Sequence, residues 1–306
     1  MKQLPEGLLL VDKCAGVTSH DVVAQVRRLT GQRKTGHAGT LDPFATGLLP
    51  MMLGRGTRLI RFLPSSPKVY QGTLQLGRTT SSDDVTGETL TEHGGRLPDG
   101  DGVLQAAGKL TGLIRQVPPA VSARKVDGER MYRRARRGET VEAPATEVEI
   151  FEFSLSPTDS PAIWSFTAQV SPGTYIRALA RDLGAALECG GVLASLKRTA
   201  IGPFRVEDAV PLPEWARPEQ VPDLAEHVTS LDHLPLDLPS LQIENQRDAG
   251  LFLSGGRLDL GNRAGTGPQF RVTGPDGTLL GVGEDNGGVL QPRVVLPTPD
   301  SPACPG

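Results

Sequence analysis

The chain has 306 residues, 38% of them hydrophobic, and a formal net charge of −3. This length fits one large domain or two ordinary ones, and the hydrophobic content is sufficient for a core. No apolar run is long enough to span a membrane, and the N-terminus lacks a long apolar signal segment, so we expect a cytoplasmic protein. Its three cysteines are far apart and fit neither a disulfide framework nor a zinc site.

Charge is unevenly distributed along the chain. Residues 207–306 carry a net charge of −9, which leaves +6 for residues 1–206. Basic side chains cluster on both sides of a glycine-rich segment, at 27–34 and 55–61, and again at 124–137. Such density favours a polyanionic partner, because each neutralised phosphate releases a counterion. Two solvated basic faces would give the same composition.

The first 76 residues predict a strand, a helix and a second strand. The apolar run 8–11 is typical of a buried strand. Thr18 is placed to cap a helix because Asp21 follows three residues later, and Gly31 ends that helix. Residues 69–76 alternate in polarity, which predicts a strand with Tyr70 on the side of the core, near a possible cleft.

The middle of the chain predicts a loop, two strands and a helix. Residues 81–102 read as a loop, and Asp101 is the expected cap of the helix that follows. Strands are predicted at 148–155 and 163–170. Thr174 is the expected N-cap of a helix whose first turn contains Tyr175 and Arg177. Arginine is disfavoured at a helix N-terminus, so Arg177 predicts an anionic partner, with a solvated surface arginine as the alternative.

A change of composition near residue 207 predicts the domain organisation. Residues 207–240 are rich in proline and predict a linker, whereas 241–296 show a helix at 246–253 and three strand patterns. We therefore expect a catalytic domain at 1–206, the linker at 207–240, a small β-rich module at 241–296 and a disordered tail at 297–306.

The segment 34–50 surrounds a single carboxylate, Asp42, with glycines and prolines. Gly39 and Gly47 permit unusual backbone angles or close approaches, and Pro43 biases Asp42 toward an extended conformation. An ordinary glycine-rich turn is the alternative. Motifs of zinc deaminases, phosphate-binding loops and serine hydrolases are absent from the sequence. The chemistry that remains is that of a carboxylate nucleophile, which an arginine would orient. An aromatic face would then stack a base that has left its helix.

Taken together, these motifs resemble those of the bacterial tRNA pseudouridine 55 synthases, the B-type pseudouridine synthase family. The resemblance rests on residues 7–21, on Gly36-His37-Ala38-Gly39-Thr40-Leu41-Asp42-Pro43 with 47–50, on the Tyr70 strand, and on the blocks 117–123, 173–177 and 196–204. It implies an α+β fold with a mixed, mainly antiparallel sheet and flanking helices, followed by a small PUA-like RNA-binding module.

The resemblance also implies an activity, the isomerisation of uridine to pseudouridine at position 55 in the TΨC loop of tRNA. The target base would be flipped out, and no cofactor or metal is implied. Asp42 falls on the nucleophile, with attack on C1′, attack on C6 and a glycal route all open. Tyr70 would stack on the uracil and is a candidate base, and Arg177 would pair with Asp42. The implied substrate-binding residues are His37, Tyr175, Leu196, Lys13, Arg124 and Lys125.

Three features depart from the family pattern. Cys14 stands where the family has proline, Thr80 stands where it has an acid, and the C-terminal module is acidic.

A non-catalytic RNA-binding protein and a synthase acting on ribosomal RNA are the alternative hypotheses. The expected partner is the T-arm of tRNA; no protein partner is implied, and we expect a monomer.

Overall fold

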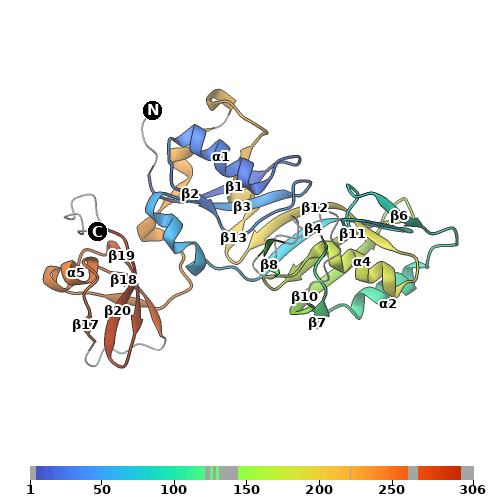
Figure 1. Ribbon diagram of the computed structural model, residues 1–306. Helices are drawn as coiled ribbons and strands as arrows, with labels where there is room; N and C mark the ends of the chain where they lie inside the picture. The colour runs from blue at the N-terminus through green and yellow to red at the C-terminus, as the bar shows by residue number, and fades with distance from the viewer. Residues whose placement is uncertain are drawn as a thin grey trace.

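The computed structural model describes residues 5–120, 125–126, 129–130, 144–220, 222–260 and 268–297. Its largest element is an 11-stranded sheet, whose main path runs β14-β1-β3-β12-β4-β11-β10-β7 (Figure 1). In that order the strands are β14 (Val210–Leu212), β1 (Gly7–Lys13), β3 (Thr46–Leu53), β12 (Gly191–Ile201), β4 (Lys68–Leu76), β11 (Ile163–Val170), β10 (Thr146–Pro157) and β7 (Gly112–Gln116).

Three short strands complete this sheet: β2 (Thr35–His37) on β3, β13 (Phe204–Arg205) on β12, and β15 (Val228–Ser230) on β1. Among the described strands, the pairs β1–β14 and β3–β12 are parallel and the other pairs of the sheet are antiparallel. The prediction of a mixed, mainly antiparallel sheet is therefore confirmed.

Helices bury two separate parts of the sheet. Helix α1 (Ser19–Thr30) packs its valines on β1 and β3, whereas α2 (Gly100–Gly108) and α4 (Ile176–Ala186) cover β4, β10 and β11. The predicted bounds of α1 are confirmed by a capping box between Thr18 and Asp21 and by Gly31 at the C-cap with φ 69°. No helix in the described part of the chain is long and apolar enough to cross a membrane.

Two predicted helix caps are wrong. Asp99, not Asp101, caps α2, because its carboxylate accepts from the Gly102 amide at 2.9 Å. Thr174 does not cap α4, which begins one residue later than predicted, with Tyr175 at the N-cap position. Gln116 of β7 explains this start, since its side-chain amide binds both the N–H and the C=O of Tyr175.

The predicted loop 81–102 contains a strand. Strand β6 (Thr89–Glu92) pairs with β5 (Arg78–Thr80) as a separate two-stranded sheet. Every residue of β6 is exposed, so its sequence lacks the polar–apolar alternation of a half-buried strand. A second small pair, β8 (Lys125–Val126) and β9 (Glu129–Arg130), lies within the predicted basic cluster.

Two short strands of the proline-rich segment 207–240, which the sequence analysis predicts as a linker, belong to the large sheet. Its strands β14 and β15 both pair with β1, and Val210, Leu212, Leu224 and Leu234 are buried. The prolines interrupt the segment with turns and single-turn helices, which separate the buried residues from one another. The sequence therefore shows no continuous strand pattern here. Those 3-10 helices are η2 (Val206–Asp208), η3 (Pro218–Gln220), η4 (Leu224–His227) and η5 (Leu231–His233). Where one domain ends and the next begins stays a prediction.

A β-rich module follows, as predicted. Its five-stranded sheet has the order β16-β18-β19-β20-β17 and is covered by helix α5 (Gln246–Leu253). The strands are β16 (Ser240–Gln242), β17 (Leu258–Asp259), β18 (Gln269–Thr273), β19 (Leu279–Asp285) and β20 (Val289–Val295). Figure 1 shows this module at the end of the molecule opposite β6.

The module shares a hydrophobic core with the N-terminal part of the chain. Leu279 and Val282 of β19 belong to the same buried cluster as Leu8 of β1 and Phe62 of the 3-10 helix η1 (Gly54–Phe62). Leu234 is fully buried in this cluster, and its carbonyl accepts from Arg271 Nη1 at 2.8 Å. The module is therefore packed against the sheet domain and not merely tethered to it.

This shared core predicts a large effect for Leu234→Ala. We expect the free energy of unfolding to fall by about 2–5 kcal/mol, the usual cost of emptying a buried leucine site. Urea unfolding followed by tryptophan fluorescence measures it. Leu251→Ala is the matched control, because Leu251 is 43% exposed. Equal unfolding midpoints for the two variants would show that the cluster does not join the two parts.

Candidate active site

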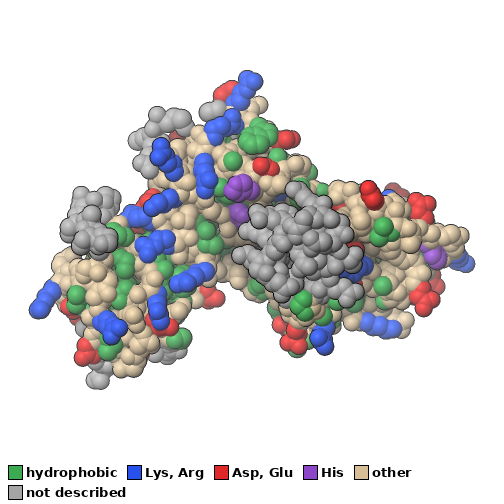
Figure 2. All heavy atoms as spheres, viewed as in Figure 1, with side chains coloured by type: hydrophobic (Ala, Val, Ile, Leu, Met, Phe, Trp, Pro, Cys, Tyr) green, Lys and Arg blue, Asp and Glu red, His purple; other side chains and the backbone are tan. Residues whose placement is uncertain are grey.

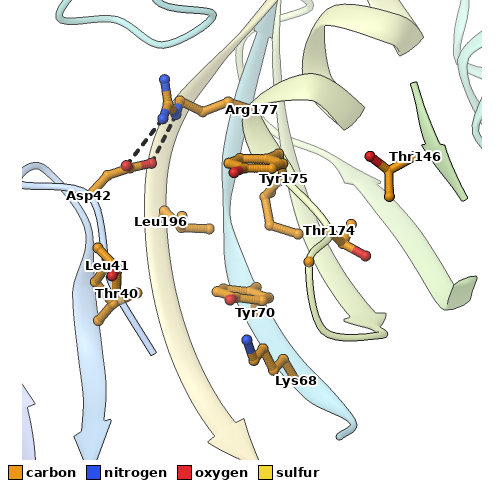
Figure 3. Close-up of a pocket in the computed structure, with 12 residues that line it drawn as sticks. Thr40, Leu41, Asp42, Lys68, Tyr70, Thr146, Thr174, Tyr175, Arg177 and Leu196 are labelled. Carbon is orange, nitrogen blue, oxygen red and sulfur yellow. Dashed lines mark hydrogen bonds and ion pairs between the residues drawn. The ribbon is translucent and has the colours of Figure 1, made fainter. Parts of the chain in front are cut away.

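A pocket of about 490 Å³ lies between the Asp42 segment, β4, β12 and the start of α4 (Figure 3). Its lining includes Asp42, Tyr70, Tyr175, Arg177 and Leu196, which come from four separate parts of the sequence. The structure thus brings together five of the residues that the sequence analysis singled out. Their roles in chemistry are argued below as a proposal.

Asp42 and Arg177 form a bidentate ion pair at the edge of this pocket. Arg177 Nε donates to Asp42 Oδ2 at 2.8 Å, and Nη2 donates to Oδ1 at 3.1 Å (Figure 3). The arginine side chain is 5% exposed, whereas the carboxylate is 34% exposed. Two parallel hydrogen bonds fix the plane of a carboxylate as well as its position. Asp42 is therefore both oriented and accessible from the pocket.

A loop between β5 and β6 holds the other side of Arg177. Arg177 Nη1 donates to the Ser82 carbonyl at 2.8 Å and lies 3.8 Å from Asp84 Oδ2. Asp84 is buried and accepts hydrogen bonds from Ser82 Oγ and from the amide and hydroxyl of Thr86. The sequence analysis did not select Asp84. Its one local signal is the Asp-x-Thr pattern of an Asx turn, in which the aspartate binds backbone two residues on.

Thr80, one of the departures from the family pattern, has a defined position in this loop. It is buried, and its hydroxyl donates to the Asp84 carbonyl at 2.7 Å. Asp83 is also held here, by Arg181 Nη1 at 3.0 Å, and burial raises the pKa of Asp83. The loop that contacts Arg177 is thus fixed by local hydrogen bonds.

Lys13 holds the backbone next to Asp42 through hydrogen bonds, and the prediction that it binds substrate is wrong. It is fully buried, and its ammonium donates to the carbonyls of Cys14, Val17 and Pro43 at 2.8, 2.8 and 3.2 Å. Burial lowers its pKa to about 8. With its three donors on backbone carbonyls, Lys13 has no surface to offer to RNA and instead fixes the residue after Asp42.

Arg198 supports the same segment, and the sequence analysis missed it. Its fully buried guanidinium donates to the carbonyls of Leu48, Gly39 and Thr40 at 2.9, 3.0 and 3.3 Å. The backbone of β12 also passes close to Gly47, where an added Cβ would lie 2.3 Å from the Arg198 carbonyl oxygen. One sequence signal was available. Arg198 stands two residues after Leu196, so both side chains lie on the inward face of β12, and this could have indicated a buried structural arginine.

Arg198 predicts a positional effect on catalysis. We expect Arg198→Met to lower kcat by about 100-fold, because a displacement of about 1 Å in an active-site group has an effect of this size. KM for RNA should change much less. Lys197→Met is the control, since its side chain is 47% exposed on the opposite face of the strand. Equal kcat values for the two variants, measured on folded protein, would contradict the positional role.

Aromatic and aliphatic side chains form the remaining pocket wall. Figure 3 shows the rings of Tyr70 and Tyr175 along one side, with Leu196 between Tyr70 and Asp42. Tyr70 and Leu196 are both buried, on the neighbouring strands β4 and β12. Gly72 lets these strands approach, since an added Cβ would lie 2.1 Å from the Ser195 carbonyl oxygen.

Of the remaining predicted substrate-binding residues, the structure describes the side chain of His37 but not those of Arg124 and Lys125. His37 is half-buried in β2 and does not line it. Burial lowers the pKa of His37, and its Nδ1 atom is buried without a hydrogen bond among the described residues. Arg124 lies outside the described residues. Lys125 begins β8, but its side chain is outside the described part. Binding of RNA by these three residues stays a prediction.

Comparisons with known proteins identify the family. The model of the TruB family pseudouridylate synthase N-terminal domain matches residues 27–176, and that of the tRNA pseudouridylate synthase B C-terminal domain matches residues 177–233. The tRNA pseudouridine synthase B of Thermobifida fusca (strain YX) is 45% identical over 300 residues, which cover 96% of this chain and 99% of that protein. The chain belongs to the TruB family. It is therefore an enzyme that isomerises uridine to pseudouridine, and the family predicted from the sequence is confirmed.

Further comparisons agree with this assignment. The tRNA pseudouridine synthase B of Corynebacterium glutamicum (strain R) is 42% identical over 285 residues, 92% of this chain and 93% of that protein. A chain in the structure of an H/ACA RNP bound to a substrate RNA containing 2′-deoxyuridine has a TM-score of 0.68 at 21% identity, covering 96% of this chain and 86% of that one. A chain of a Cbf5-Nop10-Gar1 complex has a TM-score of 0.65 at 23% identity, covering 91% and 78%. At such identities the likeness of these two structures confirms the pseudouridine synthase fold.

Proposed function

We propose that this TruB family enzyme isomerises the uridine at position 55, in the TΨC loop of tRNA, with Asp42 as the nucleophile. The observation that carries the proposal is the bidentate pair of Asp42 and Arg177 at the edge of a pocket with two tyrosines. Relatives over nearly the whole chain are named tRNA pseudouridine synthase B, which supports tRNA as the substrate.

The geometry of the pocket supports a flipped-out base. Asp42 is reached through a concavity and not on a flat face, so a uridine stacked inside an RNA helix could not bring its sugar to the carboxylate. Tyr70 offers an aromatic wall for the extruded uracil, and stacking of this kind contributes about 1–3 kcal/mol per base. Tyr175 and Leu196 extend the apolar lining. Binding energy from these walls offsets the cost of unstacking the base.

Isomerisation requires that one bond break and another form at the same sugar carbon. The N1–C1′ bond breaks, the uracil rotates within the pocket, and C5 bonds to C1′. Asp42 can form a covalent intermediate at C1′ or at C6, or assist a glycal route. In each route Arg177 keeps the carboxylate aimed at the nucleotide through its paired hydrogen bonds. The apolar walls hold the detached base close to C1′ while it turns.

Exposed basic side chains of the N-terminal part support a polyanionic substrate. Figure 2 shows blue Lys and Arg side chains spread across the part of the visible face that includes the N-terminal sheet and the C-terminal module. The basic residues of the first predicted cluster that are exposed are Arg27, Arg28, Arg33, Lys34, Arg58 and Arg61. They suit the T-arm backbone, because phosphate contacts position an RNA without reading its sequence. We propose that the acidic C-terminal module contributes less to this binding.

The experiment is a tritium-release assay with a tRNA transcript labelled at C5 of uridine, followed by nucleotide-resolution mapping of pseudouridine. We expect release from one site, the target uridine of the T-loop, and none from a transcript with cytidine there. Ribosomal RNA fragments serve as the competing substrate. Modification of ribosomal RNA but not of tRNA would contradict the proposed substrate, and binding without any release would favour a non-catalytic role.

A further inference from the structure

Lys68 is a pocket residue to which the mechanism above gives no role. It begins β4 and stands two residues before Tyr70, so both side chains leave the strand on the same face. Both line the pocket that contains Asp42. Figure 3 shows the Lys68 side chain beside Tyr70, on the side away from Tyr175. An amine is thus placed next to the ring on which we propose the uracil stacks.

The environment of Lys68 disfavours its charged form. The part of the chain that the structure describes offers its Nζ no hydrogen bond and no ion pair, in contrast to Lys13 with its three carbonyl acceptors. Burial, together with the positive charge of Arg198, lowers the pKa of Lys68 to about 8. A lysine in such surroundings exists partly as the neutral amine near neutral pH and can accept a proton.

The isomerisation needs a proton acceptor at one defined step. When C5 has bonded to C1′, it still carries its own hydrogen, and the ring is not yet aromatic. That proton must leave C5 before pseudouridine is formed. Asp42 is held at the edge of the pocket by two hydrogen bonds from Arg177, whereas Lys68 lies beside the ring of Tyr70, on which we propose the uracil stacks. Tyr70 itself is the alternative acceptor, and the test below separates it from Lys68. Arg177 itself cannot accept a proton.

We propose that Lys68 Nζ accepts the proton from C5. The C5–H bond breaks and its proton passes to the neutral amine. Its electron pair re-forms the C5=C6 double bond, and the C6=N1 pair moves onto N1, which takes a proton from water. The ammonium then releases its proton to solvent. This inference rests on the proposed binding of the target uridine in the pocket.

Two variants distinguish a role of Lys68 as a proton acceptor from a role as a positive charge alone. Lys68→Met keeps the length of the side chain and removes the amine, and Lys68→Arg keeps the charge but cannot act as a base near neutral pH. Single-turnover rates are measured with tRNA carrying protium or deuterium at C5 of the target uridine. We expect both variants to be slower by about 100-fold or more, the usual contribution of a general base. A primary deuterium isotope effect should appear in both, because proton removal becomes rate-limiting.

Controls distinguish this inference from the proposed function. Lys109→Met removes an exposed lysine outside the pocket and should match the unaltered enzyme. Absence of turnover in the unaltered enzyme would refute the proposed function itself. A nearly normal rate for Lys68→Arg would overturn the inference and leave only a charge at this site. Slow variants without an isotope effect, or the isotope effect in Tyr70→Phe instead, would overturn it as well.

Discussion

We expect Asp42→Asn to lower the rate of isomerisation by about 10⁴-fold or more, as for removal of the nucleophile in a covalent mechanism. The amide keeps the shape of the side chain but loses the negative charge and the nucleophilic oxygen. One of its two hydrogen bonds to Arg177 is also lost, because the amide nitrogen cannot accept from the guanidinium. The affinity for tRNA should change by less than about threefold, since the basic surface is untouched.

Single-turnover tritium release and filter binding with the same tRNA measure the two quantities separately. Asp101→Asn is the matched control, because it removes an exposed carboxylate from the first turn of α2. It should retain the full rate. A rate for Asp42→Asn within about tenfold of the unaltered enzyme would refute the role of Asp42, whatever its effect on binding.

Arg177→Lys should lower kcat by about 100- to 1,000-fold, comparable to the loss of a preorganised group that aligns a reacting charge. Lysine retains the positive charge but cannot make the two parallel hydrogen bonds to Asp42, and its shorter reach loses the Ser82 carbonyl. Asp42 then rotates away from the productive direction. Because the partner of Arg177 is a carboxylate and not a phosphate, KM for tRNA should change little.

Steady-state kinetics over a range of tRNA concentrations test this split between kcat and KM. Arg293→Lys is the control, because Arg293 pairs with Glu284 in the C-terminal module, outside the pocket lining. We expect it to change kcat by less than about threefold, as for exposed or partly exposed ion pairs. An increase in KM with unchanged kcat for Arg177→Lys would indicate a role in RNA binding instead.

Local signals in the sequence were sufficient where a helix depends on its own residues. Thr18, Asp21 and Gly31 form the caps that they predicted for α1, and α5 begins and ends at the predicted residues. The start of α4 depends on Gln116, which lies 59 residues away in the sequence. No local pattern could reveal that contact, so the cap was assigned to Thr174.

Buried charges were harder to predict than the pair of Asp42 and Arg177. The family motif indicated Asp42 and Arg177, and the structure brings them together. Lys13 and Arg198 are basic residues near the same motif, and composition alone does not distinguish a cation that meets phosphate from one that meets backbone carbonyls. The distinction arises from tertiary structure, in which both side chains donate to backbone carbonyls of the Asp42 segment. Asp84 was missed because its contact with Arg177 also arises only in the tertiary structure.

The most direct test of the account is a crystal structure of Asp42→Asn bound to a T-arm RNA. We expect a single uridine outside the loop stack, with its base against Tyr70 and its C1′ or C6 atom within about 3.5 Å of the Asn side chain, near the distance required for attack. An RNA bound with all of its bases stacked and the pocket between Asp42 and Tyr70 empty would contradict the proposed mechanism.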